Sequence, residues 1–381
     1  MRPYTLILIL NILIVTDKKM MNKMNIQLAT KPDFDVCCQR IEAWFHQEII
    51  DRAPIRFHRH NAEYDLVMSS SPHTSLKDRW MDAEYQAQTF LNSVRGQRFN
   101  AETFPVYMPN LGPNFFAAVH GAELDFAENT SWCEPVINSM EDLKKIQFSK
   151  ENIYYKQMRK LTEAALQICG DQFLVGYTDL HPGMDCAAAW RGSENLCFDL
   201  MLDPDMVCEL LRLSMEHLLD VYNEYHELLT AHNQPSVTWM NIPVPGGRMH
   251  IPSNDFSFMI STEQFDEYAL PILQQEVKTM THNVFHVDGK GVARHIDSIL
   301  SVPKVRAIQW VQGMADDYPI MQHLEFIKYV QSKGISIIVD LDKRDLDKFM
   351  ERMSPKGIFL WIATDNDEEE SSIIRKLLRW E

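Results

Sequence analysis

Short apolar runs alternate with longer amphipathic stretches along most of this 381-residue chain, and no other feature constrains the fold as strongly. Apolar runs this short are typical of strands that are buried on both faces, and the stretches between them have helical periodicity. Strands that alternate with helices pair in parallel, and about eight such units close a barrel. We therefore expect an α/β fold, a single (β/α)8 TIM barrel with additional N-terminal helices.

The expected elements follow from these runs and from local capping signals. Asp203-Pro204 and Ser261 to Gln264 are typical of helix starts. The expected strands are Phe104–Met108, Phe173–Tyr177, Val237–Met240, Asn283–Val287, Arg306–Trp310, Ser336–Val339 and Ile358–Trp361, with a short one at Leu124–Phe126. The expected helices are 33–50, 77–95, 150–169, 204–231, 262–280, 291–300, 320–333, 343–353 and 367–379. Residues 51–76 have no clear period, and the long loop Pro243–Ile260 is rich in Pro and Gly, as binding loops often are.

The first 24 residues are set apart from the barrel domain, which we expect to span residues 25–381. Leu6 to Val15 is an apolar run too short to cross a bilayer as a helix. It resembles the core of a signal peptide, but Asp17 follows without a small-residue cleavage site. We interpret the segment as a misassigned start that precedes Met20 to Met24, and an export signal is the alternative.

The charge balance argues against two classes of partner. Lys and Arg number 37 against 53 Asp and Glu, which gives a net charge of −16. Nucleic acids and anionic membranes are bound by clustered basic residues, so we expect neither as a partner. The 7 cysteines have no framework spacing, which favours a reduced, cytoplasmic protein. The size and the acidic surface permit a homodimer.

Two pairs of ligand-type side chains follow expected strands. His286 and Asp288 end one strand, and Asp179 and His181 follow another. Residues two apart on a strand share one face, and barrel enzymes hold their catalytic groups at the carboxyl ends of strands. His286, Asp288 and His181 are therefore candidate ligands of a divalent metal, and His286, Asp288 and Asp179 are candidate catalytic groups. The alternative is that each His bonds local backbone and each Asp caps a turn.

Other polar residues near strand ends are candidates for catalysis or substrate binding. Asp255, in the long loop, is a candidate acid or base, or a turn cap. Arg191 and Arg248 have the fork geometry that binds carboxylates, and their alternative role is a surface ion pair. The candidate substrate-binding residues are His181, Asn110, Gln309, Trp310, Arg191 and Arg248.

The sequence resembles the uroporphyrinogen decarboxylase superfamily, which includes porphyrinogen decarboxylases and corrinoid-linked methyltransferases. The segments that carry the resemblance are Gly121 to Phe126 with Trp132 to Pro135, Thr178 to His181, Pro252 to Phe256 with Ser261 and Phe265 to Pro271, His286 to Gly289 with His295 to Asp297, and Ala307 to Trp310. The resemblance covers roughly residues 100–360. It implies a barrel enzyme that acts on a small molecule.

The sequence departs from the family pattern at two motifs, and both departures bear on which activity to expect. Porphyrinogen decarboxylases carry an early Arg-Gln-Ala-Gly-Arg-Tyr motif, but Ile55 to Tyr64 reads differently here, although Arg56 and Arg59 lie within it. The zinc methyltransferases use His-x-Cys and a later Cys, whereas Asp288 follows His286 and no Cys follows Cys208. Any metal, such as zinc, must then be held by nitrogen and oxygen ligands.

The resemblance thus favours metal-assisted methyl transfer between a small substrate and a corrinoid protein or folate-type acceptor. A porphyrinogen carboxy-lyase is the first alternative, and it needs a positive pocket. A non-catalytic binding protein on the same fold is the second alternative, and it predicts that bulky neighbours fill the strand ends.

Overall fold

The computed structural model describes residues 24–59, 71–311 and 320–381, so residues 1–23 of the segment set apart above lie outside it. The main sheet has six parallel strands in the order β1-β10-β9-β8-β7-β6. Their bounds are β1 Ile55–His58, β6 Met249–His250, β7 His282–Asp288, β8 Ala307–Val311, β9 Ser336–Asp340 and β10 Ile358–Ala363. A separate parallel pair joins β2 (Val106–Tyr107) and β5 (Leu174–Val175).

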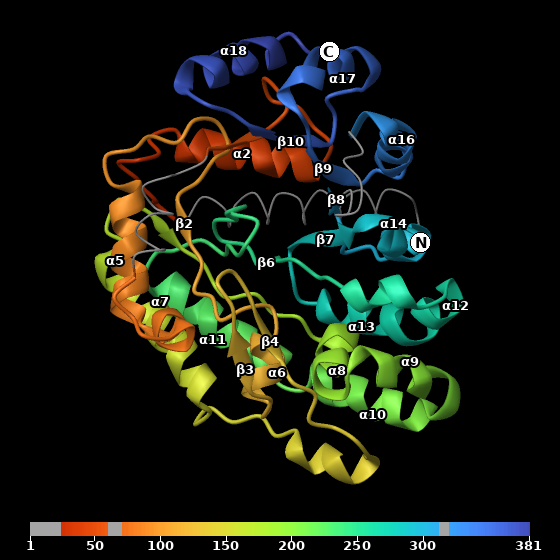
Figure 1. The fold of residues 1–381 in the computed structure, drawn as a ribbon. Coiled ribbons are helices and arrows are strands. Elements are labelled where there is room, and N and C mark those ends of the chain that lie inside the picture. The colour runs from red at the N-terminus through yellow and green to blue at the C-terminus, as the bar shows by residue number, and fades with distance from the viewer. Residues whose placement is uncertain (1–23, 60–70, 312–319) are drawn as a thin grey trace, which may run out of the picture.

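Helices and turns connect the strands and surround them (Figure 1). The first half of the chain contains α2 Phe34–Phe45, α4 Leu76–Met81, α5 Ala83–Val94, α6 Phe115–Val119, η1 Met140–Lys145, α7 Ile153–Ile168, α8 Gly183–Arg191 and α9 Ser193–Leu202. The second half contains α10 Pro204–Met215, α11 Leu218–Ala231, η2 Asp255–Met259, α12 Thr262–Gln264, η3 Phe265–Ala269, α13 Leu270–Glu276, α14 Gly289–Ala293, α15 Ile296–Leu300, η4 Ile320–Gln322, α16 Leu324–Ser332, η5 Lys343–Asp345, α17 Leu346–Arg352 and α18 Asp367–Leu377. None of these described helices is both long enough and apolar enough to cross a membrane.

The strands separate two hydrophobic cores, because successive side chains point to opposite faces. On β7, Phe285 and Val287 belong to the core that includes residues of the surrounding helices. Val284 belongs to a second, inner core with Ile338 of β9 and Leu174 of β5. Since the main sheet and the β2–β5 pair share this inner core, the sheet curls toward the pair.

Helix α2 closes the inner core at the amino-terminal ends of the strands. Trp44 of α2 is fully buried and packs edge-on against Phe359 of β10, with 5.4 Å between ring centroids. Its indole N–H donates to the Gly357 carbonyl over 2.9 Å. The inner core is thereby covered at the amino-terminal ends of the strands.

The four C-terminal strands match the sequence expectation to within a few residues, whereas other elements differ. The run Leu124–Phe126 forms β3, which pairs antiparallel with β4 (Ser131–Cys133) in a separate hairpin, so it is no barrel strand. The expected strand Val237–Met240 turns back at once, because Asn241 has a positive φ of 54° and its N–H bonds the Thr238 carbonyl. The expected helix 204–231 breaks where His217 adopts left-handed geometry. Residues 51–76, expected to be irregular, contain β1.

Candidate active site

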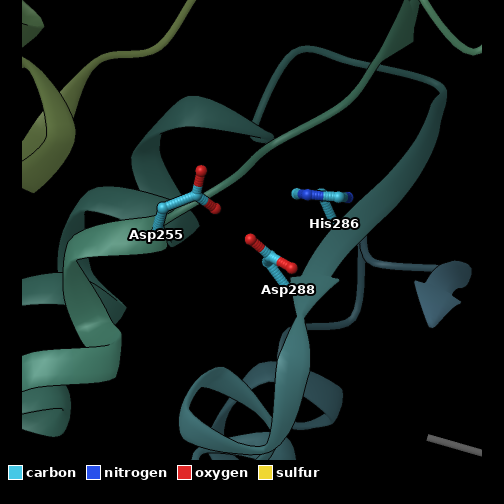
Figure 2. A group of neighbouring side chains, drawn as sticks. All are labelled: Asp255, His286 and Asp288. Atoms are coloured by element: carbon cyan, nitrogen blue, oxygen red, sulfur yellow. The ribbon is translucent and has the colours of Figure 1, made fainter. Parts of the chain in front are cut away.

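Three ligand-type side chains converge at the carboxyl end of β7. One ligand atom from each of Asp255, His286 and Asp288 lies within 4.8 Å of the others. Figure 2 shows the two carboxylates pointing into the space beside the imidazole. His286 and Asp288 share the inner face of β7, as their spacing predicts. Both side chains therefore lie on one face at the carboxyl end of β7.

Asp255 reaches this place because its segment runs along β7. Ser253 forms a parallel bridge with His286, and the His286 N–H donates to the Pro252 carbonyl over 2.9 Å. The chain then turns into η2, whose first residue is Asp255. The long loop Pro243–Ile260 is therefore ordered by β6 and η2 and delivers a carboxylate to the site.

Gln309 orients His286. The two residues are register partners on β8 and β7, and Gln309 Oε1 lies 2.7 Å from His286 Nδ1. An amide oxygen only accepts hydrogen bonds, so Nδ1 carries the imidazole proton and Nε2 is left as the lone-pair nitrogen. The Trp239 ring packs edge-on against the same imidazole at 5.2 Å. His286 is thus held between Gln309 and Trp239, with Nε2 left without a proton.

Asp185, which the sequence analysis missed, fixes the position of η2. Its carboxylate accepts from the backbone N–H groups of Asp255 and Phe256, over 3.0 and 2.8 Å. Burial and the neighbouring Asp255 charge raise the pKa of Asp185 to about 6. Its only sequence signal was an acid in the first turn of α8, just after a strand end. Such acids usually cap helices, so the pattern did not distinguish it.

His181 and Asp179 form a hydrogen-bonded pair beside the three-residue group. His181 Nε2 bonds Asp179 Oδ2, and the buried Nδ1 has no protein partner among the described residues. Burial alone would lower the pKa of His181, but Asp179, with Asp185 and Asp255 nearby, outweighs it and raises the pKa to about 10. His181 lies outside the group of Asp255, His286 and Asp288, so the structure does not assemble the expected two-His, two-Asp set around one point.

A cavity of about 620 Å³ opens beside Asp255 and Asp288. Its lining contains His181, Asp185, Asp255 and Asp288, and none of its described lining residues is Lys or Arg. Its remaining lining includes apolar side chains such as Phe256, Phe258 and Met259, together with small residues of α8. The cavity is therefore acidic, and it has room for a small organic molecule and water.

The structure places four of the expected substrate-binding residues elsewhere. Arg191 is engaged by Asp199 over 2.6 Å and by two backbone carbonyls, so it holds α8 to its neighbours. Arg248 precedes β6 at the amino-terminal end of the strands, where it stacks on Tyr222 at 4.6 Å. Trp310 points to the outer core.

Trp310 was expected to bind substrate, but the alternation of side chains along β8 turns it away from the site. Gln309 points inward, so its neighbour Trp310 points outward and packs on Phe326 of α16, with 4.5 Å between centroids. Asn110 does follow β2, but its side chain accepts from the Gly112 N–H over 2.7 Å and shapes a turn. Neither residue lines the acidic cavity among the residues described.

Comparisons with known proteins identify the fold. No protein-family model matches the chain, and no curated protein matches it in sequence. A methyltransferase from Methanosarcina mazei matches in structure with a TM-score of 0.55, over 90% of this chain and 98% of that one, at 10% identity. An enolase protein from the Sargasso Sea environmental genome overlaps loosely, with a TM-score of 0.28 over 88% of this chain and 62% of that one, at 9% identity. The Methanosarcina match shows a shared fold and no more.

Proposed function

We propose that this chain is an enzyme of the uroporphyrinogen decarboxylase superfamily that transfers a methyl group with the help of a bound divalent metal. The donor or acceptor is a small molecule in the acidic cavity, and the other partner is a corrinoid protein or a folate-type cofactor. The observation that carries the proposal is the convergence of Asp255, His286 and Asp288 on one point at the mouth of this fold.

The donor set fits a divalent ion. One imidazole nitrogen and two carboxylates suit zinc and several other divalent metals, although they select less strongly than thiolates do. Three protein ligands leave coordination positions for water and substrate, as catalytic sites require. When bound, such an ion supplies Lewis-acid activation of the nucleophile that accepts the methyl group. The hydrogen bond from His286 to Gln309 supports a ligand role, because metal-binding histidines are held through their second nitrogen.

The remaining polar residues position groups and handle protons. Asp185 holds the backbone of η2, so it keeps the Asp255 carboxylate facing His286. His181, oriented by Asp179, presents Nδ1 without a protein partner and lines the cavity. We assign His181 to proton delivery at the substrate and Asp179 to its orientation, as in other Asp–His pairs.

A protein partner fits the surroundings of the cavity. Phe258 and Met259 line it and are more than half exposed. Ser193 of α9 also lines it, and the end of α9 carries exposed Met201 and Leu202. Exposed apolar side chains close to a site are typical of protein contact surfaces, which is what delivery of a carried corrinoid requires.

The acidic lining disfavours the porphyrinogen alternative. A porphyrinogen carries many carboxylates, and three aspartates without a lining Lys or Arg would repel them. The open cavity also disfavours the non-catalytic alternative, which predicts filled strand ends.

We also propose that the main sheet and the β2–β5 pair close into one barrel. The Glu102 N–H bonds the Ile55 carbonyl of β1, and the Tyr177 N–H bonds the Val237 carbonyl, both over 2.9 Å. The first bond joins the segment before β2 to β1. The second joins the segment after β5 to Val237, and the neighbouring Ser236 hydroxyl accepts from the Met249 N–H of β6 over 2.9 Å.

The direct test of the activity uses methylcobalamin as probe. Zinc-loaded protein would be mixed with methylcobalamin and a panel of small thiol and amine acceptors, and the visible spectrum followed for loss of the methyl–cobalt bond. We expect conversion that needs both metal and protein and that His286→Ala abolishes while the protein stays folded. Conversion no faster than in the protein-free control across the panel would overturn the methyl-transfer proposal, and a uroporphyrinogen assay would follow.

A further inference from the structure

The two carboxylates of the candidate metal site belong to different elements (Figure 2). Asp288 is the last residue of β7 and the N-cap of α14, whereas Asp255 is the first residue of η2. The bridge that ties this loop to β7 involves Ser253, two residues before Asp255. The distance between the two carboxylates therefore depends on how η2 lies against the helices that follow β7.

The surfaces of η2 and α14 lie in close contact. A Cβ atom added to Gly291 of α14 would lie 1.9 Å from Phe258 Cδ2 of η2, so a glycine is needed for this approach. Arg294, which follows α14, donates to the Phe258 carbonyl over 3.2 Å. Phe258 and Arg294 are both exposed, and exposed contacts constrain a segment less than a buried hydrogen bond does.

The buried contact with η2 comes from His295, which is only 1% exposed. Its Nε2 lies 2.9 Å from the carbonyl oxygen of Ser257, 38 residues earlier in the chain. A carbonyl only accepts hydrogen bonds, so Nε2 carries the proton and donates it. The Ile260 N–H shares this carbonyl over a longer distance of 3.3 Å.

The His295 ring is held in place for this one bond. It stacks on the Phe265 ring, with 4.4 Å between centroids and 9° between planes. His295 is the N-cap of α15, yet its side chain makes no capping hydrogen bond. Nδ1 has no partner among the described residues, and burial lowers the pKa of His295, so the ring is neutral at pH 7. Its single N–H is therefore directed to η2.

We propose that His295 is a positioning residue, which sets where η2 presents Asp255 to the metal by holding the Ser257 carbonyl. The inference rests on the proposed function in one respect, namely that Asp255 and Asp288 bind a metal. Asp185 of α8 holds the first two N–H groups of η2, so His295 fixes the same segment from a second side. Metal ligands must lie within about 0.2 Å of their ideal distances, so a small shift of η2 weakens binding in a protein that stays folded.

The test is a zinc titration at pH 7 against a chromophoric chelator, beside denaturant unfolding of the same metal-free proteins. His295→Phe keeps a ring against Phe265 but removes the N–H, and it should weaken zinc binding about tenfold. His295→Gln keeps an N–H donor without the ring, and it should retain most of the zinc affinity. A purely structural role predicts the reverse order, because a phenylalanine packs better against Phe265 than a glutamine does. His295→Met takes the place of the phenylalanine variant if that protein does not fold.

Two controls show whether His295 acts through Asp255. In the Asp255→Ala background, His295→Phe should cause no further loss of zinc affinity. His226→Phe replaces another stacked histidine, which lies on Tyr222 beside Arg248, and it should bind zinc like the wild type.

Three results would overturn the role of His295. They are wild-type zinc affinity in folded His295→Phe, weaker binding in His295→Gln than in His295→Phe, or an undiminished effect of His295→Phe in the Asp255→Ala background. A wild type that binds no zinc would overturn the proposed metal site itself, and this inference with it.

Discussion

Replacing Gln309 by alanine tests how the site prepares His286. Gln309 Oε1 lies 2.7 Å from His286 Nδ1, and its side chain is largely buried, so no free water replaces it easily. Without this acceptor the imidazole can rotate, or carry its proton on the nitrogen that should bind metal. Loss of such a partner typically weakens metal binding about 10- to 100-fold, which corresponds to about 1.4–2.7 kcal/mol.

The assay is a competition titration of zinc between the protein and a chromophoric chelator at pH 7. Gln309→Glu keeps an acceptor and should retain at least the wild-type affinity. Gln331→Ala is the matched control, because the side chain of Gln331 donates to the backbone carbonyls of Ser354 and Lys356 and contacts no histidine among the described residues. In the His286→Ala background, Gln309→Ala should have no further effect. Wild-type zinc affinity in folded Gln309→Ala would refute the role of this hydrogen bond.

Three further substitutions probe the charges and the core. Asp179→Asn should bring the pKa of His181 down from about 10, because burial then dominates, and NMR titration of the imidazole measures it. Because the pKa of His181 is higher in the folded than in the unfolded protein, its pairing with Asp179 stabilises the fold fully below about pH 6.5 and progressively less as the pH rises toward 10. The stability that Asp179→Asn loses should therefore decrease over that pH range. A loss that does not change with pH would contradict this. Ile338→Ala should cost about 2–5 kcal/mol in denaturant unfolding, since Ile338 is buried in the inner core, and a cost below 1 kcal/mol would speak against that packing. Glu102→Gln should cost about 3–5 kcal/mol, because buried Arg52 loses the carboxylate that binds it over 2.7 Å, and near-wild-type stability would show that the pair is dispensable.

The C-terminal strands were predictable because they are regular and buried. Residues 283–287 and 358–361 are apolar runs bounded by turns, and period alone placed His286 and Asp288 on one face. Strand β1 was not predicted, because Ile55 to His58 alternates apolar and basic residues within a polar stretch. In such an alternating strand the polar residues usually face solvent, whereas Arg56 and His58 face the inside of the sheet.

The candidate site was predictable only where it lies on a regular strand. Asp255 was one of several polar loop residues, and the bridge between Ser253 and His286, together with the hydrogen bonds to Asp185, places it at the site. Asp185 had no distinctive pattern, because the backbone N–H group of Asp255 that it binds lies 70 residues away in sequence. Arg191 and Arg248 were expected to bind substrate carboxylates. Arg191 is paired with Asp199 instead, and Arg248 lies at the amino-terminal end of the strands, away from the site.

Metal content measured by elemental analysis tests the central claim most directly. The protein would be purified without chelator, incubated with zinc and desalted, beside His286→Ala and the distant control His232→Ala, whose ring bonds the Leu228 carbonyl. We expect about one equivalent of zinc in the wild type and in the control, and almost none in His286→Ala, with all three proteins folded. No zinc in the wild type, or equal zinc in wild type and His286→Ala, would contradict the proposal that Asp255, His286 and Asp288 form a metal site.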